Sequence, residues 1–182
     1  SDAFDCFNES MHDMEKTLKD IYEFPVSTVG QVSQQIIEDS IKNIDSHTGI
    51  SGVPSNLIEL DRVTGGWQPS DLIIIAARPS MGKTALAVQL ALGAAIVHKR
   101  SVAIFSLEMS QQQLVGRMQS VLSGVSSSKI IKKQLDHSEI DRIRRTTQSL
   151  NEANIYIDDC ASLSVLDFKS KSRKLVKEQK VE

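Results

Sequence analysis

The residues best suited to chemistry form one short loop between an apolar run and an apolar helical pattern. The loop consists of Ala77, Arg78, Pro79, Ser80, Met81, Gly82, Lys83 and Thr84, and Ala85 follows it. A loop that ends in Gly-Lys-Thr between a strand and a helix is typical of a phosphate-binding P-loop. Its backbone N–H groups would face a polyphosphate, Lys83 would add a cation, and the Thr84 hydroxyl would bind Mg²⁺. The motif therefore predicts nucleoside triphosphate binding; the alternative is a chance Gly-Lys-Thr turn before a helix.

One position departs from the usual P-loop pattern, because Ala77 stands where a glycine is expected. Alanine is the smallest residue that carries a Cβ, so its backbone can still pass close to a phosphate when φ is negative. Arg78 could either reach a phosphate or brace the loop, and the sequence leaves both interpretations open.

A carboxylate stands at the end of the next predicted strand, where Glu108 follows the mostly apolar residues 101–107. Ligands of parallel sheets lie beyond the carboxyl ends of the strands, so Glu108 and the P-loop are expected to face one crevice. A carboxylate there can orient or deprotonate the water that attacks a γ-phosphate. On spacing alone, a helix N-cap or a surface acid explains Glu108 equally well.

Strand and helix signals alternate around these residues and predict the elements that position them. The predicted strands cover residues 72–77, 102–107 and 155–158, and the predicted helices cover residues 83–98, 110–123, 127–134 and 137–152. A last helix is expected to open with a capping box at Ser164 and Asp167. Alternation of this kind predicts an α/β fold, a mostly parallel sheet with helices on its faces.

Two amphipathic helices are predicted before this α/β region. The first has apolar residues at Phe4, Phe7, Met11, Met14, Leu18 and Ile21, and the second at Val29, Val32, Ile36, Ile37, Ile41 and Ile44. Each has one apolar side that must be buried, either on the following domain or on a neighbouring protomer. A Gly- and Pro-rich connector over residues 47–54 separates the regions, which predicts a helical arm over 1–46 and a second domain over 47–182.

Composition limits the remaining function classes. The 182 residues are 40% apolar, enough for one substantial core, and no run approaches the length of a membrane span. The widely spaced Cys6 and Cys160 fit the reducing cytoplasm, and the four histidines share no metal-ligand spacing. Residues 1–46 carry ten acidic and three basic side chains, which suits either a solvated arm or docking on a basic surface of another subunit. The net charge of −2 gives no strong nucleic-acid signal.

The motifs together resemble the bacterial DnaB-type replicative DNA helicases. The resemblance rests on residues 53–55, 60–66, 71–84, 105–110 and 155–159, and it extends over residues 47–182. It implies a RecA-like P-loop NTPase core that is incomplete at its C-terminus and is preceded by two helices of an interdomain linker. It also implies that Lys83 holds the β- and γ-phosphates of ATP, that Thr84 ligates Mg²⁺, and that Glu108 is the catalytic carboxylate of ATP hydrolysis. Asn56 stands where many members carry glycine, and asparagine tolerates the positive φ of such a turn.

The resemblance further implies a cytoplasmic homohexamer that moves along single-stranded DNA at the replication fork, with a primase and a helicase loader as partners. Two alternatives stay open at this point: another RecA-like ATPase, or a catalytically inert interaction fragment. In the family, a Walker B aspartate, a sensor glutamine, DNA-binding loops and an arginine finger follow the motifs found here. None of them is recognised before residue 182, so we expect a fragment that binds nucleotide weakly and turns it over slowly, if at all.

Two features near the C-terminus imitate functional motifs. Ile155-Tyr156-Ile157-Asp158-Asp159 resembles a Walker B strand, but its place in the chain matches the strand before Walker B. We therefore interpret Asp158 as an acid that caps the following turn. The alternative is that Asp158 is a direct ligand of Mg²⁺. The basic side chains of the last helix are interpreted as a solvated face, with a phosphate contact as the alternative: Lys169, Lys171, Arg173, Lys174, Lys177 and Lys180.

Overall fold

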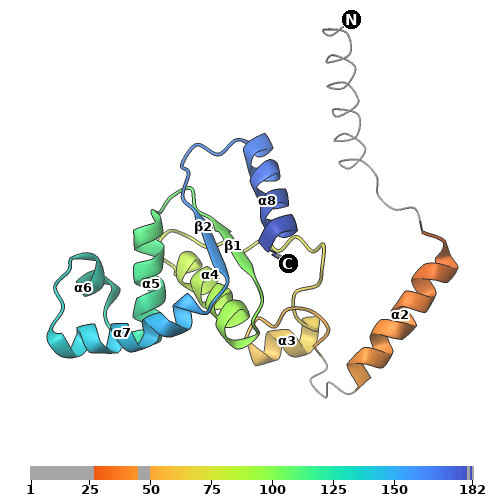
Figure 1. Ribbon diagram of the computed structural model, residues 1–182, viewed down its shortest axis with the longest axis horizontal. Coiled ribbons are helices and arrows are strands. Elements are labelled where there is room, and N and C mark those ends of the chain that lie inside the picture. Colours follow the sequence, from red (N-terminus) through yellow and green to blue (C-terminus); the bar gives the residue numbers. More distant parts are fainter. Residues whose placement is uncertain (1–26, 45–49, 180, 182) are drawn as a thin grey trace, which may run out of the picture. The chain divides into compact units, whose positions relative to one another are not determined.

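A computed structural model of the chain describes residues 27–44, 50–179 and 181. The chain divides into two units, Ser1–His47 and Thr48–Glu182, and each is described by itself (Figure 1). The helix predicted over residues 4–21 lies outside the described residues. No helix in the described ranges is both long and apolar enough to cross a membrane.

The described part of the first unit is the helix α2, Val29–Ile44, which confirms the second predicted amphipathic helix. Its start is fixed by a reciprocal cap, because the Gln31 amide donates to the Thr28 hydroxyl at 3.3 Å and the Gln31 side chain accepts from the Thr28 amide at 2.9 Å. The apolar side chains of this helix from Val29 to Ile41 are exposed to solvent. The apolar side predicted from the sequence is therefore present on this helix.

The second unit is built on two parallel strands, β1 (Val102–Phe105) and β2 (Ile155–Asp158). Their register pairs Val102 with Ile155 and Ile104 with Ile157. Because side chains alternate along a strand, these four apolar residues lie on one face of the sheet. Ile104, Ile155 and Ile157 pack there against the buried core of Val88, Leu92, Leu114 and Met118.

That core joins two helices to the sheet. The helix α4, Lys83–Leu92, contributes Val88 and Leu92, and the helix α5, Gln111–Ser123, contributes Leu114 and Met118. The predicted helix over residues 83–98 is present in two parts, because α4 continues into a wider π-helical turn, η1 (Gly93–Val97). The core therefore holds α4, the helix that begins where the P-loop ends, against the sheet.

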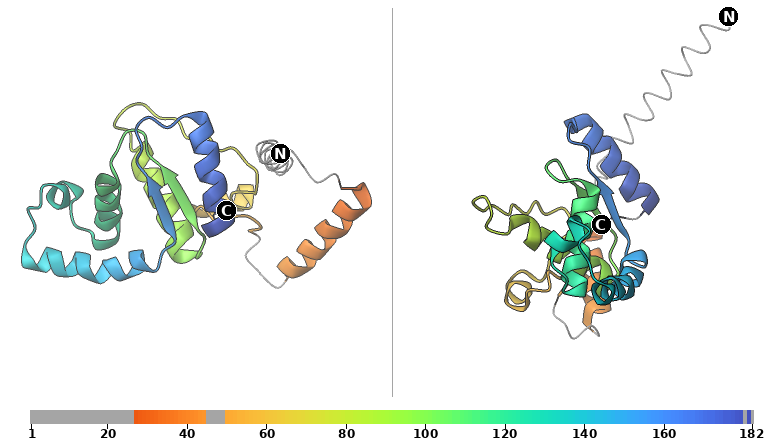
Figure 2. Two further views of the ribbon diagram at one scale, coloured as in Figure 1. Left: turned by 45° about the horizontal axis from the view of Figure 1, so that its top comes forward. Right: turned by 90° about the vertical axis from the view of Figure 1, so that its left-hand side faces the viewer.

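The helix α8, Val165–Gln179, lies on the opposite face of the sheet, as Figures 1 and 2 show. Its contacts come from the strand residues that alternate with the core set. The Phe105 and Phe168 rings meet edge to face at 4.8 Å, and the Tyr156 hydroxyl donates to Gln179 at 2.8 Å. Ser164 caps this helix, since its hydroxyl accepts from the Asp167 amide at 3.1 Å. The predicted start of the last helix is thus confirmed.

Two short helices and one long helix complete the unit. The helix α3, Ile58–Thr64, follows the connector; α6, Ser127–Ile131, is shorter than the predicted 127–134; and α7, His137–Asn151, packs on α5. A capping box between Asp136 and Glu139 starts α7, and Glu139 also pairs with Lys129 of α6 at 2.6 Å. Two hydrogen bonds and the adjacent ammonium group hold the pKa of Glu139 below its ordinary value.

The strand predicted over residues 72–77 was wrong as a paired strand. No segment among the described residues pairs with it, and most of its apolar side chains are exposed, Leu72 by 87%. A strand is defined by the ladder hydrogen bonds it makes with a neighbour, and apolar character alone does not supply one. The run is apolar, as a buried strand would be, but its sequence does not show which strand it would pair with.

Candidate functional site

The P-loop conformation depends on two residues with left-handed backbone. Ser80 has φ of 65° and Gly82 has φ of 88°. Glycine adopts this region without a steric penalty, so Gly82 can serve as the residue that turns the loop into α4. The Met81 amide closes the loop by donating to the Arg78 carbonyl at 3.2 Å. Ala77 keeps a negative φ, as the sequence requires of a residue with a Cβ at this position.

The N-terminus of α4 is open toward the loop. Within the described residues no side chain caps this helix, and its first turn contains no acidic residue. The first amides of a helix lack partners within the helix, and the helix dipole places partial positive charge beside them. An anion at this position would satisfy both features.

The predicted phosphate-binding loop and Glu108 line one pocket of about 590 Å³. The loop residues at the pocket are Ala77, Arg78, Pro79, Ser80, Gly82, Lys83, Thr84 and Ala85. Glu108, Met109 and Arg117 line the facing side. Met81 is the one residue of the predicted set that does not line the pocket, and its side chain is 73% exposed.

The pocket is electropositive. Arg78, Lys83 and Arg117 line it with three cationic groups, against the single carboxylate of Glu108. The Arg117 Nε is buried without a hydrogen-bond partner in the described part of the chain. A buried N–H that lacks a partner costs free energy, so an acceptor at this position would be bound favourably. The arrangement can therefore hold a polyanion.

Sequence reasoning did not identify Arg117. The signal was available, because Ser110, Gln113 and Arg117 are spaced by three and four residues and so share one side of α5. Because α5 begins shortly after Glu108, one of its side chains can reach the pocket, and Arg117 is the residue of this helix that lines it. Arg117 could therefore have been identified as a basic residue on that side, about two turns into the helix.

The pocket fits a magnesium ion that is held mainly by a nucleotide. Thr84 offers a hydroxyl, and the residues with assigned positions contain no group of three or more carboxylate, imidazole or thiol side chains that could hold a metal ion. Mg²⁺ commonly keeps several waters and is bound through substrate phosphates and one or two protein ligands. The Thr84 hydroxyl therefore fits an ion that is bound mainly through a nucleotide.

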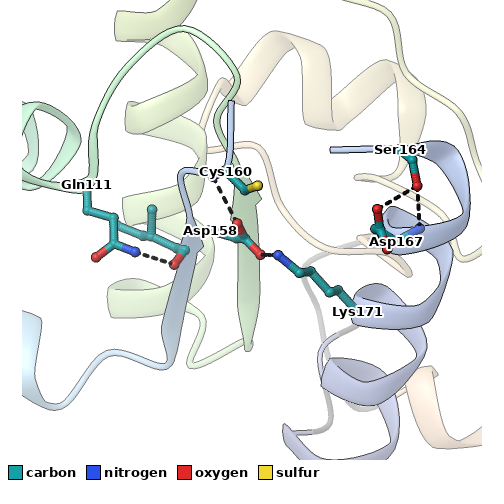
Figure 3. A network of polar contacts seen from close by, with 7 residues as sticks. Gln111, Asp158, Cys160, Ser164, Asp167 and Lys171 are labelled. Atoms are coloured by element: carbon teal, nitrogen blue, oxygen red, sulfur yellow. Dashed lines mark hydrogen bonds and ion pairs between the residues drawn. The ribbon is translucent and has the colours of Figure 1, made fainter. Parts of the chain in front are cut away.

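Asp158 does not line the P-loop pocket. It accepts a hydrogen bond from the Cys160 amide at 3.0 Å and forms an ion pair with Lys171 of α8, as Figure 3 shows. These contacts are those of an acid at a strand end that caps the next turn, as the sequence indicated. The Lys171 ammonium, with the Cys160 amide as a second cause, holds the pKa of Asp158 below its ordinary value.

Known proteins are similar to this chain over most of its length. A family model described as the DnaB-like helicase C terminal domain matches residues 52–182. The replicative DNA helicase DnaB of Geobacillus stearothermophilus is 43% identical over 141 residues, which covers 77% of this chain and 31% of that protein. The replicative DNA helicase DnaC of Bacillus subtilis strain 168 is 34% identical over 178 residues, which covers 96% of this chain and 39% of that protein.

Solved structures show the same fold. A solved structure described as an ATPase domain has a TM-score of 0.74 at 29% identity, over 86% of this chain and 54% of that one. A DnaB-like replicative helicase, studied together with its interactions with primase, has a TM-score of 0.72 at 26% identity, over 97% of this chain and 42% of that one. These likenesses confirm the predicted RecA-like α/β architecture. The chain spans about a third of the length of the two curated relatives, 31% and 39%.

Proposed function

The chain belongs to the family of DnaB-like helicase C-terminal domains, and we propose that its P-loop pocket binds and hydrolyses ATP as part of a replicative DNA helicase. The observation that carries this proposal is the convergence of Lys83, Thr84 and Glu108 on one electropositive pocket at the open N-terminus of α4. Separate segments of the chain supply the cation and the carboxylate that phosphoryl transfer to water requires.

We assign roles in hydrolysis to four pocket residues and to the first amides of α4. The amides at the start of α4 and the Lys83 ammonium bind the β- and γ-phosphates, and the Thr84 hydroxyl holds Mg²⁺. The ion, when bound, neutralises charge on the phosphate oxygens. Glu108 orients the attacking water and accepts its proton. Arg117, whose Nε has no described partner, offers an N–H to the transferred phosphoryl group.

Arg78 is a second arginine at the pocket, but it belongs to the P-loop and not to α5. It lies within the loop itself, where its backbone carbonyl already accepts from Met81. We propose that its guanidinium contributes to the positive potential of the pocket, which attracts the nucleotide.

The proposed assembly follows from the family. Residues 47–182 would form part of the ATPase domain and residues 1–46 the arm that links protomers. The exposed apolar side chains of α2 support an arm that docks on another chain, since an apolar face of that size is normally covered. The complete helicase would be a cytoplasmic homohexamer on single-stranded DNA at the fork, with primase and a loader as partners. The free Cys160 thiol suits that reducing compartment.

An interaction fragment without catalysis is the second candidate, because that exposed face of α2 needs no nucleotide to bind a partner. One variant separates the candidates. Lys83→Ala would weaken nucleotide binding in an ATPase by about tenfold or more, whereas a pairing module would keep its partner and its oligomeric state with this substitution.

The test of the hydrolytic role uses Glu108→Gln in the complete helicase. We expect Mg-ATP affinity close to that of the wild type and DNA-stimulated turnover lower by about 10²-fold or more, since the amide can accept no proton. The measurement is steady-state phosphate release beside equilibrium binding of a fluorescent ATP analogue. Turnover at the wild-type rate would refute the assignment of Glu108.

A further inference from the structure

The carboxylate of Glu108 is not held by any side chain of the described residues. It is exposed, and no hydrogen bond or ion pair connects it to the described residues. Its position in the pocket is therefore set by the backbone of the short segment between β1 and α5. The groups that fix this segment decide where the carboxylate lies.

Ser106 fixes the segment from the β1 side. Its amide donates to the Asp158 carbonyl at 2.8 Å, which extends the sheet by one bond beyond β1. Its hydroxyl donates to the Met109 carbonyl at 2.7 Å and accepts from the Met109 amide at 3.1 Å. These two bonds close a tight turn with Glu108 inside it.

Asp159 fixes the segment from the α5 side. Its Oδ2 accepts from the amide of Gln111, the first residue of α5, at 2.9 Å. The Gln111 side chain in turn donates to the Ile157 carbonyl at 3.2 Å, the bond drawn between α5 and β2 in Figure 3. The end of β2 thus holds the start of α5 by two bonds. A carboxylate at a helix N-terminus is also favoured by the helix dipole.

We propose that Asp159 is a positioning residue for the catalytic Glu108. The inference rests on the proposed function, because it needs Glu108 to act on the attacking water. Asp159 does not line the P-loop pocket and touches no reacting atom; it acts by holding the Gln111 amide, three residues after Glu108. The neighbouring Asp158 is directed to Lys171 of α8 instead, so the two adjacent acids have separate tasks.

The adjacent acids provide a matched test in the complete helicase. Asp159→Ala removes the acceptor of the Gln111 amide, and Asp159→Asn retains an acceptor oxygen. Asp158→Ala removes the ion pair with Lys171 of α8 and the acceptor of the Cys160 amide, but leaves the bond to Gln111 in place. We expect kcat for ATP hydrolysis to fall about tenfold in Asp159→Ala with KM and nucleotide affinity unchanged, because a small displacement of a catalytic group lowers the rate steeply. Asp159→Asn should stay within about threefold of the wild type, since Asn and Asp accept helix N-terminal amides almost equally well. Asp158→Ala should keep the wild-type kcat.

Several results would overturn the inference. The inference is wrong if Asp159→Ala keeps the wild-type kcat or loses nucleotide affinity in parallel with kcat. It is also wrong if Asp159→Ala loses no more activity than Asp159→Asn, or no more than Asp158→Ala. Glu108→Gln is measured in the same series to separate this inference from the proposed function. If Glu108→Gln retains full turnover, the proposed function is wrong. If Glu108→Gln is inactive while Asp159→Ala is unimpaired, only the positioning role is wrong.

Discussion

At the scale of single residues, the contact between Asp158 and Lys171 connects β2 to α8 by charge. The ion pair lowers the pKa of Asp158 and raises the pKa of Lys171, in both cases chiefly through the hydrogen bond between the two side chains. A carboxyl whose pKa is lower in the folded state stabilises the fold above its unfolded-state value of 3.8. That stabilisation is lost as the pH falls through the folded-state pKa.

The pH dependence of unfolding tests this contact. Between about pH 5 and about pH 2, the wild type should lose more stability than Asp158→Asn, since the amide has no proton to take up. Urea unfolding midpoints over this range measure the difference. Asp141→Asn, which alters an exposed 3.6 Å contact with Arg144, is the matched control and should follow the wild type. Equal pH slopes for the wild type and Asp158→Asn would show that the pair does not stabilise the fold.

At the scale of elements, the loop before α3 is joined to the π-helical turn η1. Asn56 has φ of 63°, its amide donates to the buried Asp61 at 3.1 Å, and its side chain bonds to the His98 ring at 2.8 Å. A Cβ added at Gly93 would lie 1.5 Å from the Asn56 Nδ2. The asparagine and the glycine therefore depend on each other sterically.

A double-mutant cycle tests this dependence. Gly93→Ala should destabilise the chain by about 1–3 kcal/mol, because Asn56 must move and lose its bond to His98. In the Asn56→Gly background the same change should be neutral or stabilising by about 0.5–1 kcal/mol, since alanine favours a helix over glycine. Chemical denaturation midpoints of the four variants give the coupling. The same cost of Gly93→Ala in both backgrounds would contradict the account.

The elements also show what local sequence determines. The strand over Ile155–Asp158 was predicted with its observed bounds, and the capped start of α8 was predicted from Ser164 and Asp167, which are close in sequence. The strand over 72–77 was wrong because pairing depends on a distant partner. The apolar side chains of α8 are only partly packed, since Phe168 meets Phe105 whereas Leu166 is 79% exposed. Burial, like pairing, depends on what lies opposite.

At the scale of the whole molecule, the candidate site joins segments that are distant in sequence. The P-loop motif gave its own residues, and Glu108 after β1 lines the same pocket, although the segment before the P-loop is not a paired strand among the described residues. Arg117 has only the spacing along α5 as a signal in the sequence, and Asp159 has no local signature, so the role of Asp159 becomes apparent only when the end of β2 is placed beside α5. The sequence motifs thus indicated phosphate binding, whereas the contact between Asp159 and the start of α5 could be seen only in the folded structure.

The most direct test of the central claim is Mg-ATP binding to the 182-residue chain by titration calorimetry, with Lys83→Ala and the exposed Lys132→Ala as matched variants. The account predicts saturable binding to the wild type and to Lys132→Ala. It predicts affinity at least about tenfold weaker for Lys83→Ala, because a charge-assisted hydrogen bond to phosphate is lost. Equal affinity of the wild type and Lys83→Ala, or no binding by the wild type, would contradict the assignment of this pocket as an ATP site.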